Sequence, residues 1–317
     1  MIAVGLVLVY AVLMSIWWIT MKFLMRLEAY DQGARLSFPN NVIRFASGFG
    51  TLPLILWSLT LHGGAGYLAS LPEEFWLWLS GTIILNVAIA YFYVKAMQKS
   101  VASIAVHVTM LAPVVAIGTS WLFGVDQLPS LLSIAGIFTV LGGLYVLHFS
   151  PQKYGRNLAG PAVDIWKQRG NWLWYALGLA AFAGCSIPLD KRCVQLSDYG
   201  LAPGLTLFVS WGLFYGIAAY RTGDFQAVLR FPLRRTLSGL VILGLAFGTA
   251  QGFQAEAYNY QYASAVASLK RLDAPFTVLW AWLLLREDER IEGHFAFRIV
   301  GSLIAFAGAV LIGLDRG

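Results

Sequence analysis

Charged residues are scarce in this chain. Asp, Glu, Lys and Arg make up 12% of its 317 residues, whereas 58% of the residues are hydrophobic. A soluble domain usually contains about 25% charged residues, so this composition cannot cover a surface that faces water. The composition therefore predicts a polytopic membrane protein whose main partner is the lipid bilayer.

Cysteine is almost absent as well. Cys185 and Cys193 lie in or at the end of one apolar segment, eight residues apart, and cannot bridge each other within one helix. We therefore expect no disulfide framework and no thiolate metal site. The apolar run that starts at Met1 lacks a basic n-region and is long enough to span a bilayer, so we do not expect a cleaved signal peptide.

Several functional motifs are missing. There is no Gly-rich phosphate loop followed by Lys and Ser or Thr, no His-Glu-x-x-His and no Gly-x-Ser-x-Gly. We therefore expect no ATP-driven pump, no metal or other cofactor, no catalytic residues and no enzyme activity. The net charge of +6 does not indicate a nucleic-acid partner, because the basic residues lie in short loops between apolar segments.

Ten apolar segments are long enough to cross a bilayer, for which a helix needs about twenty residues. They cover residues 2–24, 41–62, 75–97, 100–124, 128–149, 171–190, 201–220, 236–259, 262–285 and 294–314. We therefore predict an all-α membrane protein with ten transmembrane helices.

A polar connection divides these segments into two sets of five. Residues 150–170 contain Pro, Gly and basic residues and are expected to link a first repeat, 1–149, to a second repeat, 171–317. A repeat with an odd number of spans enters the membrane in the opposite sense from its copy. The two halves are therefore predicted to be inverted repeats, an arrangement that many secondary transporters share.

The two halves also resemble each other weakly in sequence. An offset of 162 places 111–113 (Leu-Ala-Pro) over 273–275 (Asp-Ala-Pro). After a loop that is three residues longer in the second half, two glycines fall over two others: Gly136 and Gly143 over Gly301 and Gly308. The matched proline and glycine spacing favours an internal repeat.

The basic residues predict an orientation. Arg44, Lys270 and Arg271 lie inside spans, and sixteen of the other nineteen Lys and Arg residues follow odd-numbered spans. Because cytoplasmic loops carry the excess of Lys and Arg, both termini are expected outside the cytoplasm.

Three charged residues lie near the middle of the ninth apolar segment: Lys270, Arg271 and Asp273. Each would cost about 2.5–3.5 kcal/mol at the centre of a bilayer, so all three must face protein or water. Lys270, Asp273 and Thr277 share one helix face. The charged group predicts a solute-binding site, and a salt-bridge network that only stabilises packing is the alternative.

Proline is expected to disturb this helix. Pro275 lacks an N–H group and leaves the carbonyl of Arg271 without its helical donor, as Pro113 does for Thr109 in the other half. Near the middle of a bilayer, a freed carbonyl is tolerated only beside protein or a wet cavity.

The eighth segment combines small and polar residues on two helix faces. One face permits close helix contact and carries Gly248, Gly252 and Glu256; the other is polar and carries Gln251, Gln254 and Tyr258. Gln251 is a candidate for solute binding.

Two titratable residues are candidates for carrying a coupling proton. Glu256 is expected either to pair with Lys270 or Arg271 and take up a proton, or to be a solvated carboxylate near a helix end. His107, in the fourth segment, can titrate near neutral pH but can equally be a packing residue.

Further polar and aromatic residues lie inside or at the ends of the apolar segments. Arg44 must find a carboxylate, a carbonyl or a solute anion, and Trp17 and its neighbour Trp18 can line the path or pack against helices or lipid. Asp190-Lys191-Arg192 is expected to end the sixth span at the membrane interface.

These features resemble the drug/metabolite transporter superfamily, in particular its EamA-type members. The resemblance covers nearly the whole chain and rests on the span count, the two halves, Lys22, Arg44 and two similar segments, 110–124 and 272–287. The first segment keeps Gly124 but has Val125 where the family has an acidic residue. The second keeps Glu287 but has Arg286 where the family has Gly.

The resemblance implies secondary transport by alternating access, as an exporter of a small metabolite across the bacterial inner membrane. The charges of Lys270 and Arg271 favour a polar or anionic solute. We expect the chain to function as a monomer. The alternatives are a flippase or membrane-embedded enzyme that acts on a lipid-linked group, and a non-transporting subunit or sensor.

Overall fold

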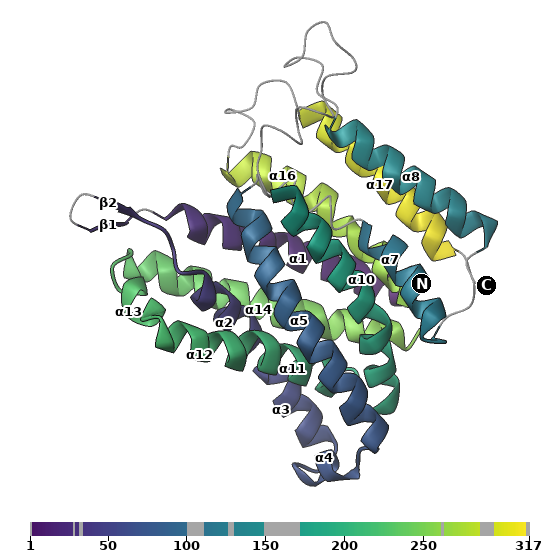
Figure 1. Ribbon diagram of the computed structural model, residues 1–317, viewed down its shortest axis with the longest axis horizontal. Coiled ribbons are helices and arrows are strands. Elements are labelled where there is room, and N and C mark those ends of the chain that lie inside the picture. Colours follow the sequence, from purple (N-terminus) through teal and green to yellow (C-terminus); the bar gives the residue numbers. More distant parts are fainter. Residues whose placement is uncertain are drawn as a thin grey trace, which may run out of the picture.

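The computed structural model describes residues 2–27, 29–31, 34–99, 111–125, 130–148, 172–260, 263–285 and 295–314. Over these residues the chain is almost entirely helical, which confirms the all-α prediction (Figure 1). The exception is a short antiparallel hairpin, β1 (Ala29–Asp31) and β2 (Ala34–Leu36), which was not predicted. The expected linker 150–170 and His107 lie outside the described residues.

The helices follow one another with short connections. They are α1 (Ile2–Arg26), α2 (Asn40–Phe49), α3 (Leu52–Leu61), α4 (Gly66–Ser70), α5 (Glu73–Lys99), α7 (Ala112–Leu122), α8 (Leu131–His148), α10 (Trp172–Leu196), α11 (Leu201–Leu207), the π-helical turn η2 (Phe208–Leu213), α12 (Phe214–Arg221), α13 (Asp224–Val228), α14 (Leu233–Tyr258), α15 (Ala263–Leu269), the 3₁₀ turn η3 (Lys270–Leu272), α16 (Asp273–Leu285) and α17 (Phe295–Leu314).

Within the described residues, five helical stretches are long and apolar enough to cross a membrane. They are Gly5–Arg26, Asn40–Leu61, Glu73–Ala96, Leu201–Arg221 and Leu233–Tyr258. Shorter apolar helices cover Ala112–Leu122, Ile134–Gly143, Pro275–Leu284 and Ile299–Gly308. The chain therefore has the character of a membrane protein.

The predicted end of the sixth apolar segment is wrong. Helix α10 does not stop at Asp190 but continues to Leu196, with Pro188 inside it. Lys191 is only 6% exposed, so the Asp190-Lys191-Arg192 run does not mark a helix end at the interface. The extension is possible because Asp190 finds a hydrogen-bond donor, Thr82 of α5, inside the helix bundle.

Helices from the two halves of the chain pack side by side. Helix α1 lies along α14, α10 along α5, and α8 along α17 (Figure 1). Helix α2 crosses η2, where a Cβ atom added to Gly48 would lie 2.1 Å from the backbone nitrogen of Gly212. Only residues without a Cβ atom permit helices to approach this closely.

The space between α1, α5, η2 and α14 is filled by an aromatic cluster. Its rings come from Trp17, Trp18, Tyr93, Trp211 and Phe247, with neighbouring centroids 4.8–5.9 Å apart. Trp17 and Trp18 are fully buried, so neither faces lipid.

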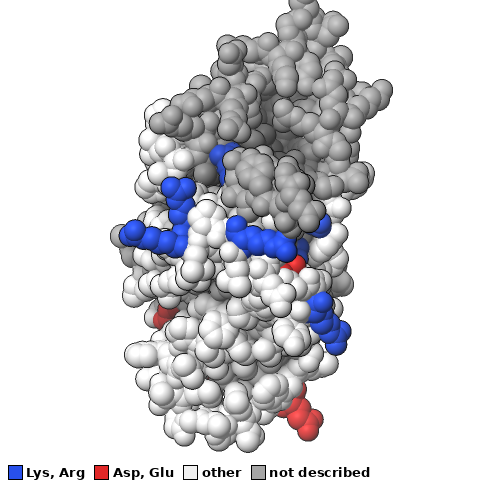
Figure 2. Space-filling view, turned by 90° about the vertical axis from the view of Figure 1, so that its left-hand side faces the viewer, with Lys and Arg blue, Asp and Glu red and all other residues white. Residues whose placement is uncertain are grey.

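One end of the molecule is basic. Figure 2 looks onto the end where the hairpin and α13 lie, and Lys and Arg side chains gather there with few acidic ones. Four exposed arginines flank α13 in the sequence: Arg221, Arg230, Arg234 and Arg235.

Candidate functional site

The helix that carries Lys270, Arg271 and Asp273 is interrupted at these residues. The α-helical path ends at Leu269, makes the 3₁₀ turn η3 over Lys270–Leu272, and resumes at Asp273. This is where Pro275 was expected to disturb the helix. Asp273 opens α16, and Lys270 and Arg271 follow the last turn of α15, so each charge lies at the helix end whose partial charge is opposite.

All four predicted binding residues of this helix are buried. Lys270 is 8% exposed, Arg271 4%, Asp273 2% and Thr277 0%. They are enclosed by protein, as their cost in a bilayer requires.

Helices α1 and α10 supply the immediate environment of these charges. The Lys270 ammonium lies 5.1 Å from the centre of the Tyr10 ring, and the Trp18 indole donates to Oδ2 of Asp273 at 3.3 Å. Lys270 is attracted by the carboxylates of Asp273 and of Asp190 on α10 and repelled by Arg271. The Thr277 hydroxyl donates to the Asp273 carbonyl of the preceding turn at 2.8 Å, so this bond stays within α16.

Asp190 belongs to this site, although the sequence analysis assigned it to the interface. Its carboxylate accepts a hydrogen bond from Thr82, and the amide of Asn86 donates to the Thr82 carbonyl at 2.9 Å. The sequence contains one indication that the helix continues past Asp190. The residues after Asp190 continue through Cys193, Val194 and Leu196 without a turn residue, as a continuing helix does.

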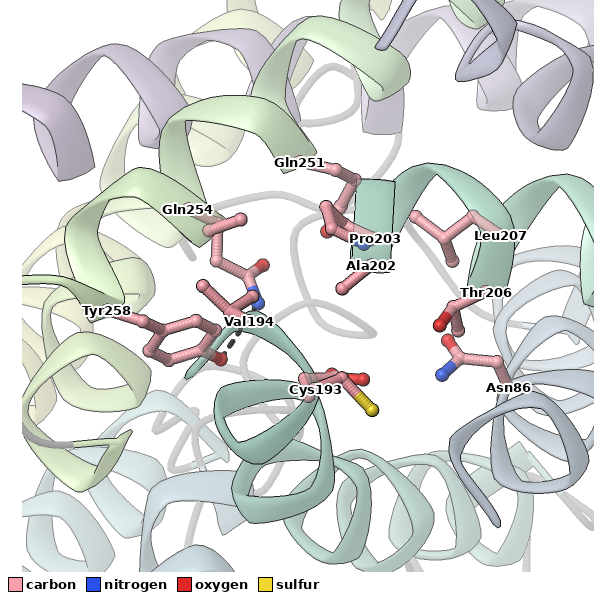
Figure 3. A pocket seen from close by; sticks show the side chains of 12 residues that line it. Asn86, Cys193, Val194, Ala202, Pro203, Thr206, Leu207, Gln251, Gln254 and Tyr258 are labelled. Carbon is pink, nitrogen blue, oxygen red and sulfur yellow. Dashed lines mark hydrogen bonds between the residues drawn. The ribbon is translucent and has the colours of Figure 1, made fainter. Parts of the chain in front are cut away.

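A small cavity of about 30 Å³ is lined in part by Asp190, and Figure 3 shows most of its lining. Its lining comes from α5, α10, α11 and α14: Asn86, Asp190, Cys193, Val194, Ala202, Pro203, Thr206, Leu207, Gln251, Gln254, Ala255 and Tyr258. Gln251, Gln254 and Tyr258 form one wall, so the polar stripe predicted on the eighth segment faces the cavity. The other predicted face of α14 packs closely, since a Cβ on Gly248 would lie 2.0 Å from the Gly50 carbonyl oxygen.

Trp17 and Arg44 are buried elsewhere in the bundle and do not line this cavity. The Trp17 indole donates to the Ser47 hydroxyl at 2.9 Å. The Arg44 guanidinium donates to the Ala90 carbonyl at 3.0 Å and to Asn41 at 2.9 Å, and lies 4.5 Å from the centre of the Tyr215 ring. The sequence analysis expected a carboxylate, a carbonyl or a solute anion as the partner of Arg44, and the structure shows carbonyl oxygens. Solute binding by either residue stays a prediction.

We expect Arg44→Lys to lower thermal stability by roughly 2–3 kcal/mol, because an ammonium cannot reach the partners of a planar guanidinium and hydrogen bonds of charged groups contribute about 1.5–3 kcal/mol. Thermal unfolding of the purified protein in detergent measures this effect. A matched substitution at an exposed arginine, Arg221→Lys, should leave stability unchanged. Unaltered stability of Arg44→Lys would show that these hydrogen bonds do not hold α2 against α5.

Glu256 does not make the pairing expected of it. Its carboxylate accepts hydrogen bonds from Asn259 and Tyr260, both at 3.1 Å, instead of bonding to Lys270 or Arg271. The bond to Glu256 raises the pKa of the Tyr260 hydroxyl. These contacts fit a carboxylate near a helix end, and coupling by Glu256 or His107 stays a prediction.

The comparisons with known proteins reveal fold similarity only. No family model and no curated protein matches the chain. Solved structures do match, among them a crystal structure that has a TM-score of 0.60 and 14% sequence identity, with 98% of this chain and 97% of that chain covered. At this identity, the chain shares an overall fold with that protein over nearly its whole length.

Proposed function

We propose that the protein is an EamA-type secondary transporter that moves a small polar or anionic solute across the bacterial inner membrane by alternating access. The observation that carries this proposal is the buried charged group at an interrupted helix. The group does not line the cavity itself, but its Lys270 is attracted by Asp190, which does. Ionisable residues inside a membrane segment commonly mark a transport path, and transporters build their sites from discontinuous helices.

The packing of the helices supports ten spans in two inverted repeats. In this assignment α2 with α3, α11 with η2 and α12, and α15 with η3 and α16 each form one span. In this assignment α1 corresponds to α10, α5 to α14 and α7 to α16. The counterpart of the α1–α14 pair is then α10–α5, and the counterpart of the α1–α16 pair is α10–α7. All four pairs are in contact. The α2–η2 and α8–α17 pairs exchange into themselves, as expected for helices that meet at a two-fold axis.

Two glycine contacts between α8 and α17 support the same symmetry. A Cβ on Gly143 would lie 2.3 Å from the nitrogen of Ala305, and a Cβ on Gly308 would lie 2.5 Å from the nitrogen of Val140. The sequence offset of 165 that relates Gly143 to Gly308 also relates Val140 to Ala305. Each contact is therefore the counterpart of the other.

The basic end near α13 supports an orientation with this end in the cytoplasm and both termini outside it. Lys270 and Arg271 would bind the anionic group of the solute. The proposed direction is export, as in exporters of the resembled family.

Solute counterflow in proteoliposomes tests the proposal. Vesicles are loaded with amino acids, phosphorylated sugars or nucleosides, and uptake of the labelled solute is followed. We expect saturable, protein-dependent counterflow of at least one polar or anionic solute. Complete absence of counterflow across this panel would contradict the proposal.

A lateral groove favours a flippase for a lipid-linked group as the second candidate. Its volume is about 530 Å³, and it runs between α2, α3, α13 and α14, with Phe45, Phe49, Leu237 and Val241 among its apolar lining residues. A flippase needs such an opening toward lipid. Movement of a fluorescent lipid between leaflets, without solute counterflow, would support this candidate.

A further inference from the structure

We propose that the cavity in Figure 3 binds one monovalent cationic group, either Na⁺ or K⁺ or a primary ammonium, through Asp190 and Gln254. This site is distinct from the anion-binding role proposed for Lys270 and Arg271. It adds a second ligand to the proposed transporter, and it stands on the geometry of the cavity.

Among the residues that the structure describes, no donor bonds to the amide oxygen of Gln254. Gln254 is only 6% exposed, its Nε2 atom donates to the Tyr258 hydroxyl at 2.9 Å, and its Oε1 atom is buried without a donor. Figure 3 shows this amide at the cavity wall, turned toward the enclosed space. A buried acceptor left unsatisfied costs about 1–3 kcal/mol, so a ligand that is positively charged or donates hydrogen bonds would be stabilised there.

The opposite wall uses its donors internally. The Thr82 hydroxyl donates to Asp190, and the Asn86 amide nitrogen donates to the Thr82 carbonyl at 2.9 Å and to its hydroxyl at 3.3 Å. The Asp190 carboxylate is therefore held in place at the cavity. The donors of Thr82 and Asn86 are therefore used within the protein, and Asp190 contributes a negative charge to the lining.

The lining of the cavity carries one negative charge. Among the described lining residues Asp190 is the one carboxylate, accompanied by neutral oxygens from Gln254, Asn86 and Thr206. Oxygen ligands suit hard cations and ammonium groups, whereas Ca²⁺ sites in proteins use several carboxylates. In the part of the chain that the structure describes, no group of three or more His, Cys, Asp or Glu side chains is arranged to hold a metal ion.

A cation at Asp190 would act on Lys270. Asp190 attracts Lys270 across the bundle, and a bound cation would neutralise this carboxylate. The Lys270 ammonium would then be freer to attract an anion. Cation and anionic solute should therefore raise each other's affinity, because binding linkage is reciprocal.

Thermal unfolding in detergent at constant ionic strength tests the site without any transport measurement. Choline chloride is replaced stepwise by NaCl, KCl or methylammonium chloride; choline is the reference because its ammonium has no N–H group and its methyl groups keep oxygens away. We expect a saturable rise in the midpoint temperature for at least one of the three cations, since a ligand of the native state stabilises it. A response to Na⁺ or K⁺ identifies a free ion, and a response to methylammonium alone identifies the ammonium of a solute.

Variants assign the response to the cavity. Asp190→Asn should abolish it, Gln254→Leu should raise the half-saturating concentration at least tenfold, and Gln254→Glu should lower it by adding a second charge. Glu74→Gln, which removes an exposed carboxylate on α5, should keep the wild-type response. Absence of a response in the wild type, or a full response in Asp190→Asn, would overturn the inference. A normal response without any counterflow would instead refute the transport proposal alone.

Discussion

Replacing Lys270 with Met is expected to abolish transport while expression and folding stay intact. The side chain of Met fills the same space. The attraction to Asp190 and Asp273 is lost, but the cost of burying an ammonium and its repulsion with Arg271 are removed with it. Folding should therefore not suffer. Solute binding loses a charged partner worth about 1.5–3 kcal/mol, which corresponds to roughly a 10- to 150-fold loss of affinity, and the transported anion would have to be desolvated without compensation.

Initial counterflow rates in proteoliposomes, at equal reconstituted protein, measure this loss. Lys270→Arg keeps the charge and should retain part of the activity, whereas Arg192→Gln, at an exposed pair with Glu74, should transport like the wild type. Wild-type flux in Lys270→Met would remove Lys270 from the mechanism.

Gly48→Ala is expected to destabilise the fold strongly. The added Cβ would lie 2.1 Å from the Gly212 nitrogen and 2.6 Å from the Trp211 carbonyl carbon. Both are backbone atoms, which cannot rotate away as a side chain does, so α2 and η2 would have to separate. Overpacking of this kind costs about 1–3 kcal/mol and more where backbone must move.

At about 2–4 °C per kcal/mol, the value for proteins of 150–250 residues, a cost of about 1–3 kcal/mol lowers the midpoint of thermal unfolding by roughly 2–12 °C. Gly118→Ala is the matched control, because Gly118 is an exposed helical glycine with open space at its Cβ position. It should leave stability unchanged or raise it slightly. An unchanged midpoint for Gly48→Ala would mean that the α2–η2 contact is looser than described.

Much of the helical framework follows from composition and length. Apolar segments predicted the helices because backbone groups in a bilayer must be satisfied within the segment. The hairpin at 29–36 could not be predicted, since a few residues in a polar loop carry little periodic signal. The end of the segment at Asp190 failed for another reason: a charge was taken as the sign of an interface, but its partner Thr82 lies more than a hundred positions away in the chain.

The candidate site was predictable in part. The cost of intramembrane charge identified Lys270, Arg271 and Asp273, and helix periodicity placed Gln251 and Gln254 on one face. The contribution of Asp190 was not accessible, because it depends on which helices meet. For Arg44 the sequence required a partner but did not choose between solute and protein, and the structure shows backbone carbonyls of α5.

The close approach of Gly48 and Gly212 has a mechanical consequence. Helices that interlock through side chains must change rotamers before they can rotate against each other, whereas at Gly48 and Gly212 the two backbones are in direct contact. Such a contact can serve as a pivot for rotation of one helix against the other. A small change in the crossing angle between α2 and η2 would move the helix ends apart on one side of the contact and bring them together on the other.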